Sequence, residues 1–175
     1  MELKFEELPY QLDAVNAVAN LFAGQPNHAR TFDLTSQGTG RFVGNGLDLD
    51  WETLGRNLNA VQKQNGQSET KIGAHGLNFS LEMETGTGKT YVYLRTVYEL
   101  NRSYGWKKFV IVVPSVPIRE GVLKSLEMTK AHFDGVFGRP VMRYAEYSST
   151  RLSDLRAFAV NDHIEILVIN IQSFE

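Results

Sequence analysis

A glycine-rich segment carries the residue types that bind phosphate groups: Met83-Glu84-Thr85-Gly86-Thr87-Gly88-Lys89-Thr90. Gly86 and Gly88 permit positive φ angles, which turn backbone N–H groups inward toward an anion. Lys89 can then reach the β- and γ-phosphates of a nucleotide, and the Thr90 hydroxyl can ligate Mg²⁺. The sequence therefore predicts a nucleotide site formed by Thr85, Gly86, Thr87, Gly88, Lys89 and Thr90, with Lys89 and Thr90 in catalytic roles.

This segment departs at one position from the strict phosphate-binding pattern, which has glycine at the first of its eight residues. Met83 stands there instead. A glycine-rich turn between a strand and a helix is common in proteins that bind no phosphate. Such a turn does not explain a lysine and a threonine directly after the last glycine, so the phosphate-binding interpretation is favoured.

The elements around this segment alternate between strand and helix patterns. The alternation of residues 77–83 predicts a strand before the loop, and a helix follows over 90–105. The apolar, β-branched run at 108–114 predicts a parallel strand buried on both faces. Further helices are expected over 117–132 and around 153–160, and further strands near 141–147 and over 164–170. This order predicts an α/β fold with a parallel sheet and right-handed crossovers.

The N-terminal part of the chain has a different character. Apolar residues at helical spacing predict a helix over 9–23, and Asp50 is placed to cap a second helix over 51–64. Residues 24–50 are rich in Gly, Asn, Thr and Ser and predict an irregular surface segment. We therefore divide the chain into an N-terminal helical region (1–23), an irregular and helical insertion (24–76) and an α/β region (77–175).

Composition limits the classes of protein to consider. The 175 residues include no cysteine, 42% are hydrophobic, 22% are charged and the formal net charge is −2, as in ordinary globular proteins. No apolar run approaches the roughly 20 residues of a membrane span, so no membrane partner is expected. Residues 89–156 carry 12 basic and 6 acidic side chains. This excess suits a phosphate chain, although charge alone favours solvated helix faces.

Several segments resemble one family of enzymes. Residues 81–122 resemble the first helicase motifs of the Res subunit of type III restriction-modification enzymes, which are superfamily 2 helicases. The first motif of that superfamily often has another residue where Met83 replaces glycine. Residues 114–122 resemble its motif Ia, and residues 170–174 resemble its motif Ib. Tyr10-Gln11 resembles the adenine-reading glutamine that precedes the first motif.

The resemblance implies an ATP hydrolase coupled to translocation along double-stranded DNA and to site-specific DNA cleavage. It implies ATP and Mg²⁺ as cofactors, a methyltransferase (Mod) subunit as partner and a cytoplasmic location. It further implies that Gln11 reads the adenine and that Ser115 and Arg119 bind the DNA backbone. On the residues alone, Gln11 is expected to be exposed. For Arg119, binding to a DNA phosphate and surface pairing with Glu120 or Glu127 are equally favoured.

Parts of this machinery are not identifiable in the sequence. Hydrolysis also needs an acidic residue on a later strand, and residues 91–175 show no Asp-Glu pair after an apolar strand. By the resemblance, that motif, a second RecA-like domain and the nuclease are expected beyond residue 175. The sequence thus predicts an incomplete RecA-like, P-loop domain that is inactive alone. A nucleotide-sensing P-loop module and a phosphotransferase that does not act on DNA are the alternatives.

Overall fold

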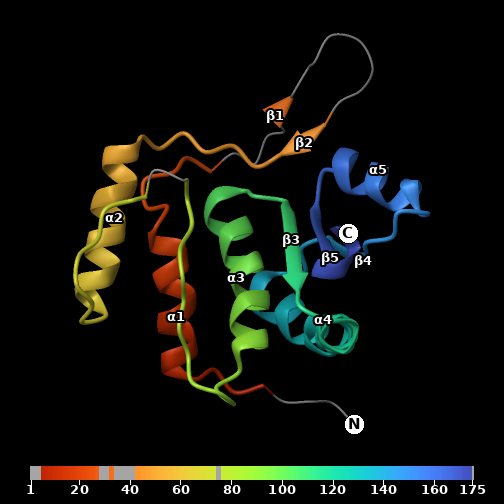
Figure 1. The fold of residues 1–175 in the computed structure, drawn as a ribbon, viewed down its shortest axis with the longest axis horizontal. Coiled ribbons are helices and arrows are strands. Elements are labelled where there is room, and N and C mark those ends of the chain that lie inside the picture. Colours follow the sequence, from red (N-terminus) through yellow and green to blue (C-terminus); the bar gives the residue numbers. More distant parts are fainter. Residues whose placement is uncertain (1–4, 28–31, 34–41, 74–75, 175) are drawn as a thin grey trace.

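The computed structural model describes residues 5–27, 32–33, 42–73 and 76–174 (Figure 1). The elements follow the order α1 (Pro9–Asn20), β1 (Phe32–Asp33), β2 (Val43–Gly44), α2 (Trp51–Gln64), α3 (Lys89–Tyr104), β3 (Lys108–Val113), α4 (Val116–Phe137), β4 (Met142–Glu146), α5 (Leu152–Val160), β5 (Ile164–Asn170) and the 3₁₀ turn η1 (Ile171–Phe174). None of the helices in this described part is long and apolar enough to cross a membrane.

The main sheet has three parallel strands in the order β3-β5-β4. β5 lies in the centre, with Val110 of β3 opposite Leu167 and Tyr144 of β4 opposite Ile166. All seven residues of β5 are buried, as expected for a strand with a neighbour on each side and helices on both faces. The parallel α/β sheet predicted from the alternation of patterns is confirmed.

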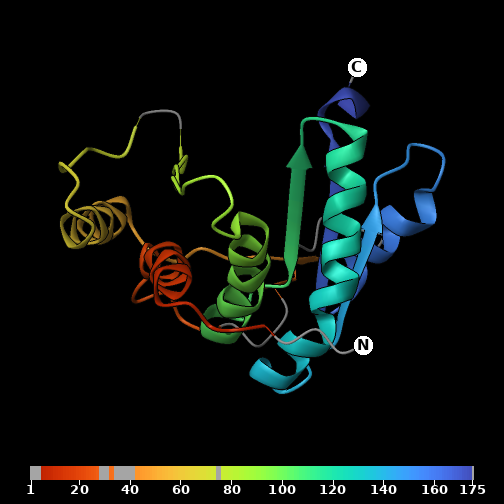
Figure 2. The same cartoon turned by 90° about the horizontal axis from the view of Figure 1, so that it is seen from below.

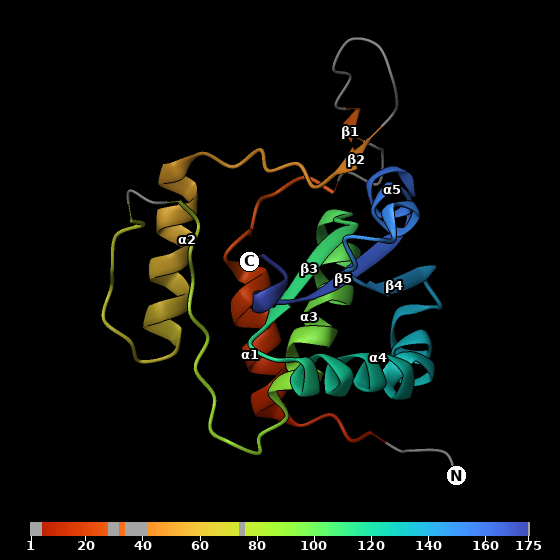
Figure 3. The same cartoon turned by 45° about the vertical axis from the view of Figure 1, so that its right-hand side comes forward.

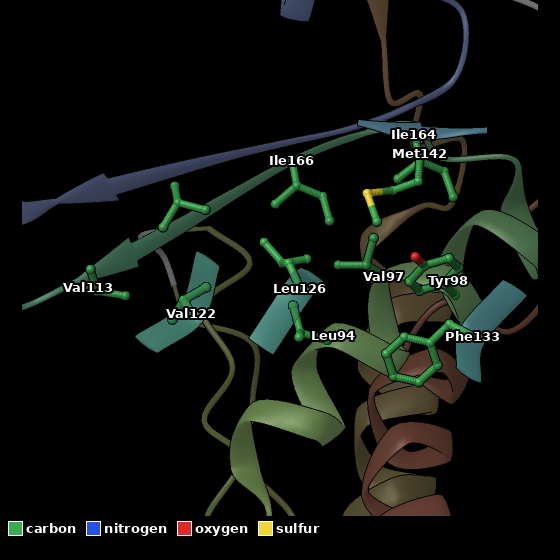
Figure 4. Packing of buried hydrophobic residues seen from close by; sticks show 11 residues of the cluster. Leu94, Val97, Tyr98, Val113, Val122, Leu126, Phe133, Met142, Ile164 and Ile166 are labelled. Carbon is green, nitrogen blue, oxygen red and sulfur yellow. The ribbon is translucent and has the colours of Figure 1, made fainter. Parts of the chain in front are cut away.

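α3 and α4 cover one face of the sheet and form the main hydrophobic core (Figure 4). Leu94 and Tyr98 of α3 and Leu126 of α4 pack against Ile164 and Ile166 of β5, and all five are almost fully buried. α5 lies on the opposite face of the sheet, and the turned view in Figure 3 shows it apart from α3 and α4. The chain passes from β3 to β4 in one direction across the sheet and returns from β4 to β5 in the other. Right-handed crossovers in opposite directions place their helices on opposite faces.

The N-terminal helices extend this arrangement outward from the sheet, in the order α3, α1, α2 (Figure 2). α1 packs against α3 through two small clusters, one of which includes Val15 and Val92. In the other, the Tyr104 hydroxyl donates to the carbonyl oxygen of Ala19 at 2.8 Å. α1 is therefore fixed to the helix that follows the glycine-rich loop.

The predicted helices are confirmed, although α1 ends at Asn20 and α4 continues to Phe137. Asp50 caps α2 by accepting from the backbone N–H of Thr53 at 2.7 Å. Residues 43–46 of the insertion are tied to the start of β3. Asn45 donates to the carbonyl oxygen of Lys108 at 2.7 Å, and the Trp106 indole donates to that of Gly46 at 2.8 Å. Much of the segment predicted to be irregular, including 34–41, lies outside the described residues.

Two predictions about strands are wrong. Residues 77–83 form irregular chain and not a strand, because no strand of the described chain pairs with them and a ladder requires a partner. β3 was expected to be buried on both faces, but Val110 and Val112 are 51% and 52% exposed. β3 is an edge strand of the described sheet, and β5 takes the central place that the apolar pattern of 108–114 indicated.

Candidate functional site

The glycine-rich loop has the backbone geometry of an anion-binding turn. Gly86 and Gly88 have φ angles of +83° and +86°, and Gly88 directly precedes α3. The first N–H groups of a helix have no acceptor within the helix, and the helix dipole adds a partial positive charge at the same point. The loop therefore directs donors and positive potential toward whatever lies at the N-terminus of α3.

The loop is closed on itself by two side chains. The ammonium of Lys89 and the hydroxyl of Thr87 both donate to the carbonyl oxygen of Glu84, each at 2.6 Å. Lys89 is exposed, so its charge is accessible from solvent. Thr90 hydrogen bonds to Tyr93 one turn along α3. Burial raises the pKa of the Tyr93 hydroxyl, and this hydrogen bond works in the opposite direction. Tyr93 therefore remains a neutral partner of Thr90.

Gln11 joins α1 to this loop. Its side-chain amide donates to the carbonyl oxygen of Thr87 at 2.9 Å, and the residue is only 6% exposed. A Cβ placed on Gly88 would come within 2.5 Å of this amide nitrogen. Two features therefore require glycine at position 88: the close approach of Gln11 and the positive φ angle. The expectation from the residues alone, that Gln11 is exposed, is wrong.

Met83 has a packing role at the position where the strict pattern has glycine. It lies half-buried against the cluster formed by Ala14, Val15 and Val92. The side chain fills the space between α1 and α3 just before the loop begins. Its presence is consistent with the loop geometry, since the two glycines that adopt positive φ are retained.

Ser115 and Arg119 lie at the start of α4, after the carboxyl end of β3. Ser115 precedes the first residue of α4, and its carbonyl oxygen accepts from the backbone N–H of Arg119 at 3.0 Å. Its hydroxyl makes no capping hydrogen bond. Ser115 is half-buried, and its neighbours Val116 and Ile118 are 44% and 49% exposed, so this turn forms an accessible surface.

The Arg119 side chain reaches across the sheet edge and is only 14% exposed. It pairs with Glu146 at 2.7 Å and with Glu120 at 3.0 Å, and it donates to Oδ1 of Asn170 at 3.3 Å. Its buried Nε has no partner among the described residues. The sequence left open whether Arg119 binds a DNA phosphate or pairs with Glu120 or Glu127. The pairing with Glu120 is present, and a shorter ion pair is formed with Glu146 on β4.

Asn170 extends this polar network into the turn after β5. The residue is 6% exposed; it accepts from the Ser173 hydroxyl at 2.6 Å and donates to Gln172 at 3.1 Å. Residues 170–173, within the segment 170–174 that resembles motif Ib, are thereby linked through Arg119 to the segment 114–122 that resembles motif Ia. The two motifs form one hydrogen-bonded unit.

The loop and this unit lie at the same edge of the sheet. Figures 1 and 2 show β3 pointing toward the end of the molecule at which α3 begins. Ligands of open parallel sheets gather at the carboxyl ends of strands. The structure thus places Gln11, the loop residues 85–90, Ser115 and Arg119 along one edge of the sheet.

Two features of the site were not predicted. Glu146, the main partner of Arg119, lies 27 residues further along the chain at the end of β4, where no local pattern marks it. Arg95, one turn beyond the loop, pairs with Glu7 at 2.7 Å and donates to the Tyr91 hydroxyl at 2.8 Å, which fixes the chain before α1. A buried arginine is expected to form an ion pair. Its partner could not be inferred from the sequence, because Glu7 lies 88 residues away in the chain.

A parallel sheet with helices on both faces, and a glycine-rich loop that opens a helix at its carboxyl edge, define an α/β domain of the P-loop, RecA-like type. A family model described as "Type III restriction enzyme, res subunit" matches residues 4–175. This chain belongs to that family.

Curated relatives agree with this assignment. The chain is 34% identical over 144 residues to the Res subunit of the type III restriction-modification enzyme EcoP15I of Escherichia coli. It is 33% identical over 143 residues to the EcoPI Res subunit of Escherichia phage P1. Each match covers 79% of this chain but 14% of the relative. A 58-residue match to the StyLTI Res subunit of Salmonella typhimurium strain LT2 is 50% identical and covers 32% of this chain and 6% of that relative.

Proposed function

We propose that this chain is the N-terminal part of an ATP-dependent DNA translocase and endonuclease subunit of a type III restriction enzyme. Residues 77–175 would form the first part of its first RecA-like domain. The observation that carries the proposal is the loop at Gly86–Gly88, whose left-handed glycines and terminal lysine open α3 in a chain of the Res family.

The loop residues fit the phosphates of ATP. Two positive-φ glycines, the N-terminus of α3 and an accessible ammonium on Lys89 converge at one point. A triphosphate would compete with the Glu84 carbonyl oxygen for Lys89, and the exchange of a neutral acceptor for an anionic one strengthens the hydrogen bond. Thr90 carries the hydroxyl suited to Mg²⁺, which would supply charge neutralisation between the phosphates.

Gln11 is placed to link recognition of the base to the phosphate loop. Its amide holds the carbonyl oxygen of Thr87, and its remaining N–H and its carbonyl oxygen can pair with N7 and the N6 amino group of adenine. Gln11 would contact the adenine of ATP and the loop would contact its phosphates, and Gln11 is already hydrogen bonded to the loop at Thr87. Base selectivity and phosphate binding are then expected to be coupled.

DNA would lie along the edge formed by the two motifs. Ser115, the backbone that follows it and Arg119 would hold the phosphate chain of one strand. Such contacts position a protein on DNA without reading bases. Arg119 is shared among Glu120, Glu146 and Asn170, so a phosphate would take the place of one of these acceptors.

The complete enzyme would act on double-stranded DNA together with a methyltransferase (Mod) subunit, in the cytoplasm, where ATP and DNA are both present. These 175 residues alone are expected to hydrolyse no ATP, because the chain spans 14% of the curated relatives that it matches over most of its length.

The test is Lys89→Ala in the full-length subunit. Loss of the cation that faces the β- and γ-phosphates should lower ATP turnover by orders of magnitude. Lys89 is exposed, and its only side-chain hydrogen bond in the described structure is to Glu84, so the melting temperature without nucleotide should barely change. Measured ATP hydrolysis at the wild-type rate in a folded variant would reject this site.

A further inference from the structure

A cavity in the insertion lies away from the glycine-rich loop. It has a volume of about 400 Å³, within the range of small-molecule sites, and α2 and the chain that returns along it form its walls. Figures 1 and 3 show this returning chain beside α2, at the outer side of α1. The cavity is lined by Trp51, Gly55, Asn59, Thr70, Lys71, Ile72 and Gly73.

The two walls are fixed to each other. The Gln62 amide donates to the Thr70 hydroxyl at 2.8 Å and accepts from the backbone N–H of Thr70 at 2.9 Å. The N–H of Gln67 donates to the carbonyl oxygen of Gln62 at 2.8 Å. Because the Gln62 amide both donates to and accepts from Thr70, the returning chain is held at one position along α2. The cavity is therefore part of the fold.

α2 supplies a flat apolar surface and an amide to this cavity. Trp51, Gly55 and Asn59 are four residues apart, so they lie on one face of the helix. Trp51 is 61% exposed, although tryptophan is one of the most apolar side chains. Gly55 has no side chain to separate the indole from Asn59. A flat ring could therefore lie over this face of α2.

Asn59 and Lys71 each lack a partner in the described part of the chain. The Asn59 Oδ1 is buried and accepts no hydrogen bond from any described residue, which is unfavourable for a carbonyl oxygen. Asn59 lines the cavity, so its side-chain amide lies within reach of an occupant. Lys71 is exposed and makes no ion pair with any described residue. The site thus offers one acceptor and one cation beside an aromatic ring.

From this combination we infer that the cavity binds a nucleotide unit, a nucleobase with its attached phosphate. The base would stack on Trp51, its exocyclic amine would donate to Asn59, and Lys71 would face the phosphate. Aromatic stacking, an amide at the base edge and a lysine at the phosphate are the elements by which proteins hold single nucleotides. An aromatic or proline-containing peptide would use Trp51 but would leave the cation of Lys71 without an anion.

The unit could come from a single-stranded DNA end or from a free nucleotide, and photo-crosslinking separates these sources. One arm uses the full-length subunit with a single-stranded oligonucleotide that contains 5-iodouracil. The other uses 8-azido-ATP in a Lys89→Ala background, in which the glycine-rich loop is weakened. Peptides that carry the label are identified by mass spectrometry. Neither arm depends on ATP hydrolysis, so failure of the proposed function would not affect the readout.

Labelling within residues 51–73 in either arm is the expected result. Trp51→Ala should lower its yield about tenfold, and Trp51→Phe should keep most of it, because phenylalanine retains a ring for stacking. Lys71→Ala should also reduce labelling. Lys63→Ala is the matched control, because it removes an exposed lysine of α2 that does not line the cavity.

Equal labelling of wild type and Trp51→Ala, or label only outside residues 51–73, would overturn the inference. Absence of labelling together with release of the methyltransferase subunit by Trp51→Ala would also overturn it, and would assign the cavity to a protein partner. Unchanged hydrogen exchange of α2 in each variant ensures that these outcomes report binding. Trp51 is largely exposed, so its replacement should leave the helix folded.

Discussion

Arg119 and Glu146 form an ion pair at 2.7 Å that joins the first turn of α4 to the end of β4. Both side chains are more than half buried, and Glu146 also lies 3.4 Å from Arg151. The charge of Arg119 is therefore largely compensated within the protein. Any anion that binds Arg119 must compete with a carboxylate that is already in place.

The first prediction concerns this competition and DNA. In the complete subunit, Arg119→Ala should weaken DNA binding alike on unrelated sequences and reduce the salt slope by about one unit, because one phosphate contact is lost. Glu146→Gln should instead strengthen DNA binding several-fold, because it releases the charge of Arg119. DNA affinity measured across a salt series would check both expectations.

Lys124→Ala is the control for this experiment, since it removes an exposed charge from the same helix without touching the network. If Arg119→Ala changed neither the slope nor the affinity, Arg119 would act only as a link between the two motifs. If Glu146→Gln weakened DNA binding, the ion pair would hold the DNA-binding surface in shape and would not compete with phosphate.

The second prediction concerns the choice of base. Gln11→Ala should weaken ATP more than GTP, because only the adenine edge loses its paired contact. Loss of a neutral hydrogen bond amounts to about 1 kcal/mol, or several-fold in affinity. Equilibrium binding of both nucleotides to the full-length variant would measure it. Equal losses for ATP and GTP would show that Gln11 acts only through its hydrogen bond to Thr87.

A third prediction concerns the contact between Gly88 and Gln11. Gly88→Ala should destabilise the α1–α3 contact, because alanine at a φ of +86° costs about 1–2 kcal/mol and its Cβ would meet the Gln11 amide at 2.5 Å. Gly86→Ala is the control: its φ is +83°, but nothing lies within 4 Å of the new Cβ. Hydrogen exchange of peptides from α1 and α3 would measure the difference.

Adding Gln11→Ala to Gly88→Ala removes the close contact but not the backbone strain. The double variant should therefore lose less protection than the sum of its two single variants, and it should approach Gly86→Ala. Additive losses in the double variant would show that α1 moves aside at little cost, and that Gly88 is required for its φ alone.

Local patterns were sufficient for features whose cause is local. The helices at 9–20 and 51–64 follow from apolar spacing and, for the second, from the Asp50 cap. The glycine-rich loop could be located for the same reason, since two glycines, a lysine and a threonine in sequence determine its chemistry. α4 runs five residues beyond the expected 132 because Phe133 and Phe137 pack against α3, a tertiary contact without local signal.

Features that depend on distant partners could not be predicted. Alternation at 77–83 is typical of a strand, but a strand exists only where another pairs with it. The apolar runs at 108–113 and 164–170 look alike in sequence, and only the sheet order decides that the second is central. Gln11 and Thr87 are 76 residues apart, so only the family resemblance indicated that Gln11 belongs to the site.

The last prediction concerns pH and the cluster that fixes the chain before α1. His132 of α4 hydrogen bonds to the Tyr91 hydroxyl at 2.9 Å, and Tyr91 in turn accepts from Arg95, which pairs with Glu7. Burial lowers the pKa of His132, the positive charge of Arg95 lowers it further, and Glu7 opposes this. The folded state therefore favours neutral His132.

Because the pKa of His132 is lower in the folded than in the unfolded chain, the unfolded chain binds more protons between the two values. The stability that His132 contributes should be complete above the unfolded value of about 6.5 and should be lost as pH falls below it. Protection factors of α3 and α4 peptides from hydrogen exchange, corrected for intrinsic rates, should decline from pH 7 to pH 5. His132→Gln should flatten this decline, because glutamine does not titrate in this range. A decline of the same size in His132→Gln would assign the pH dependence to other groups.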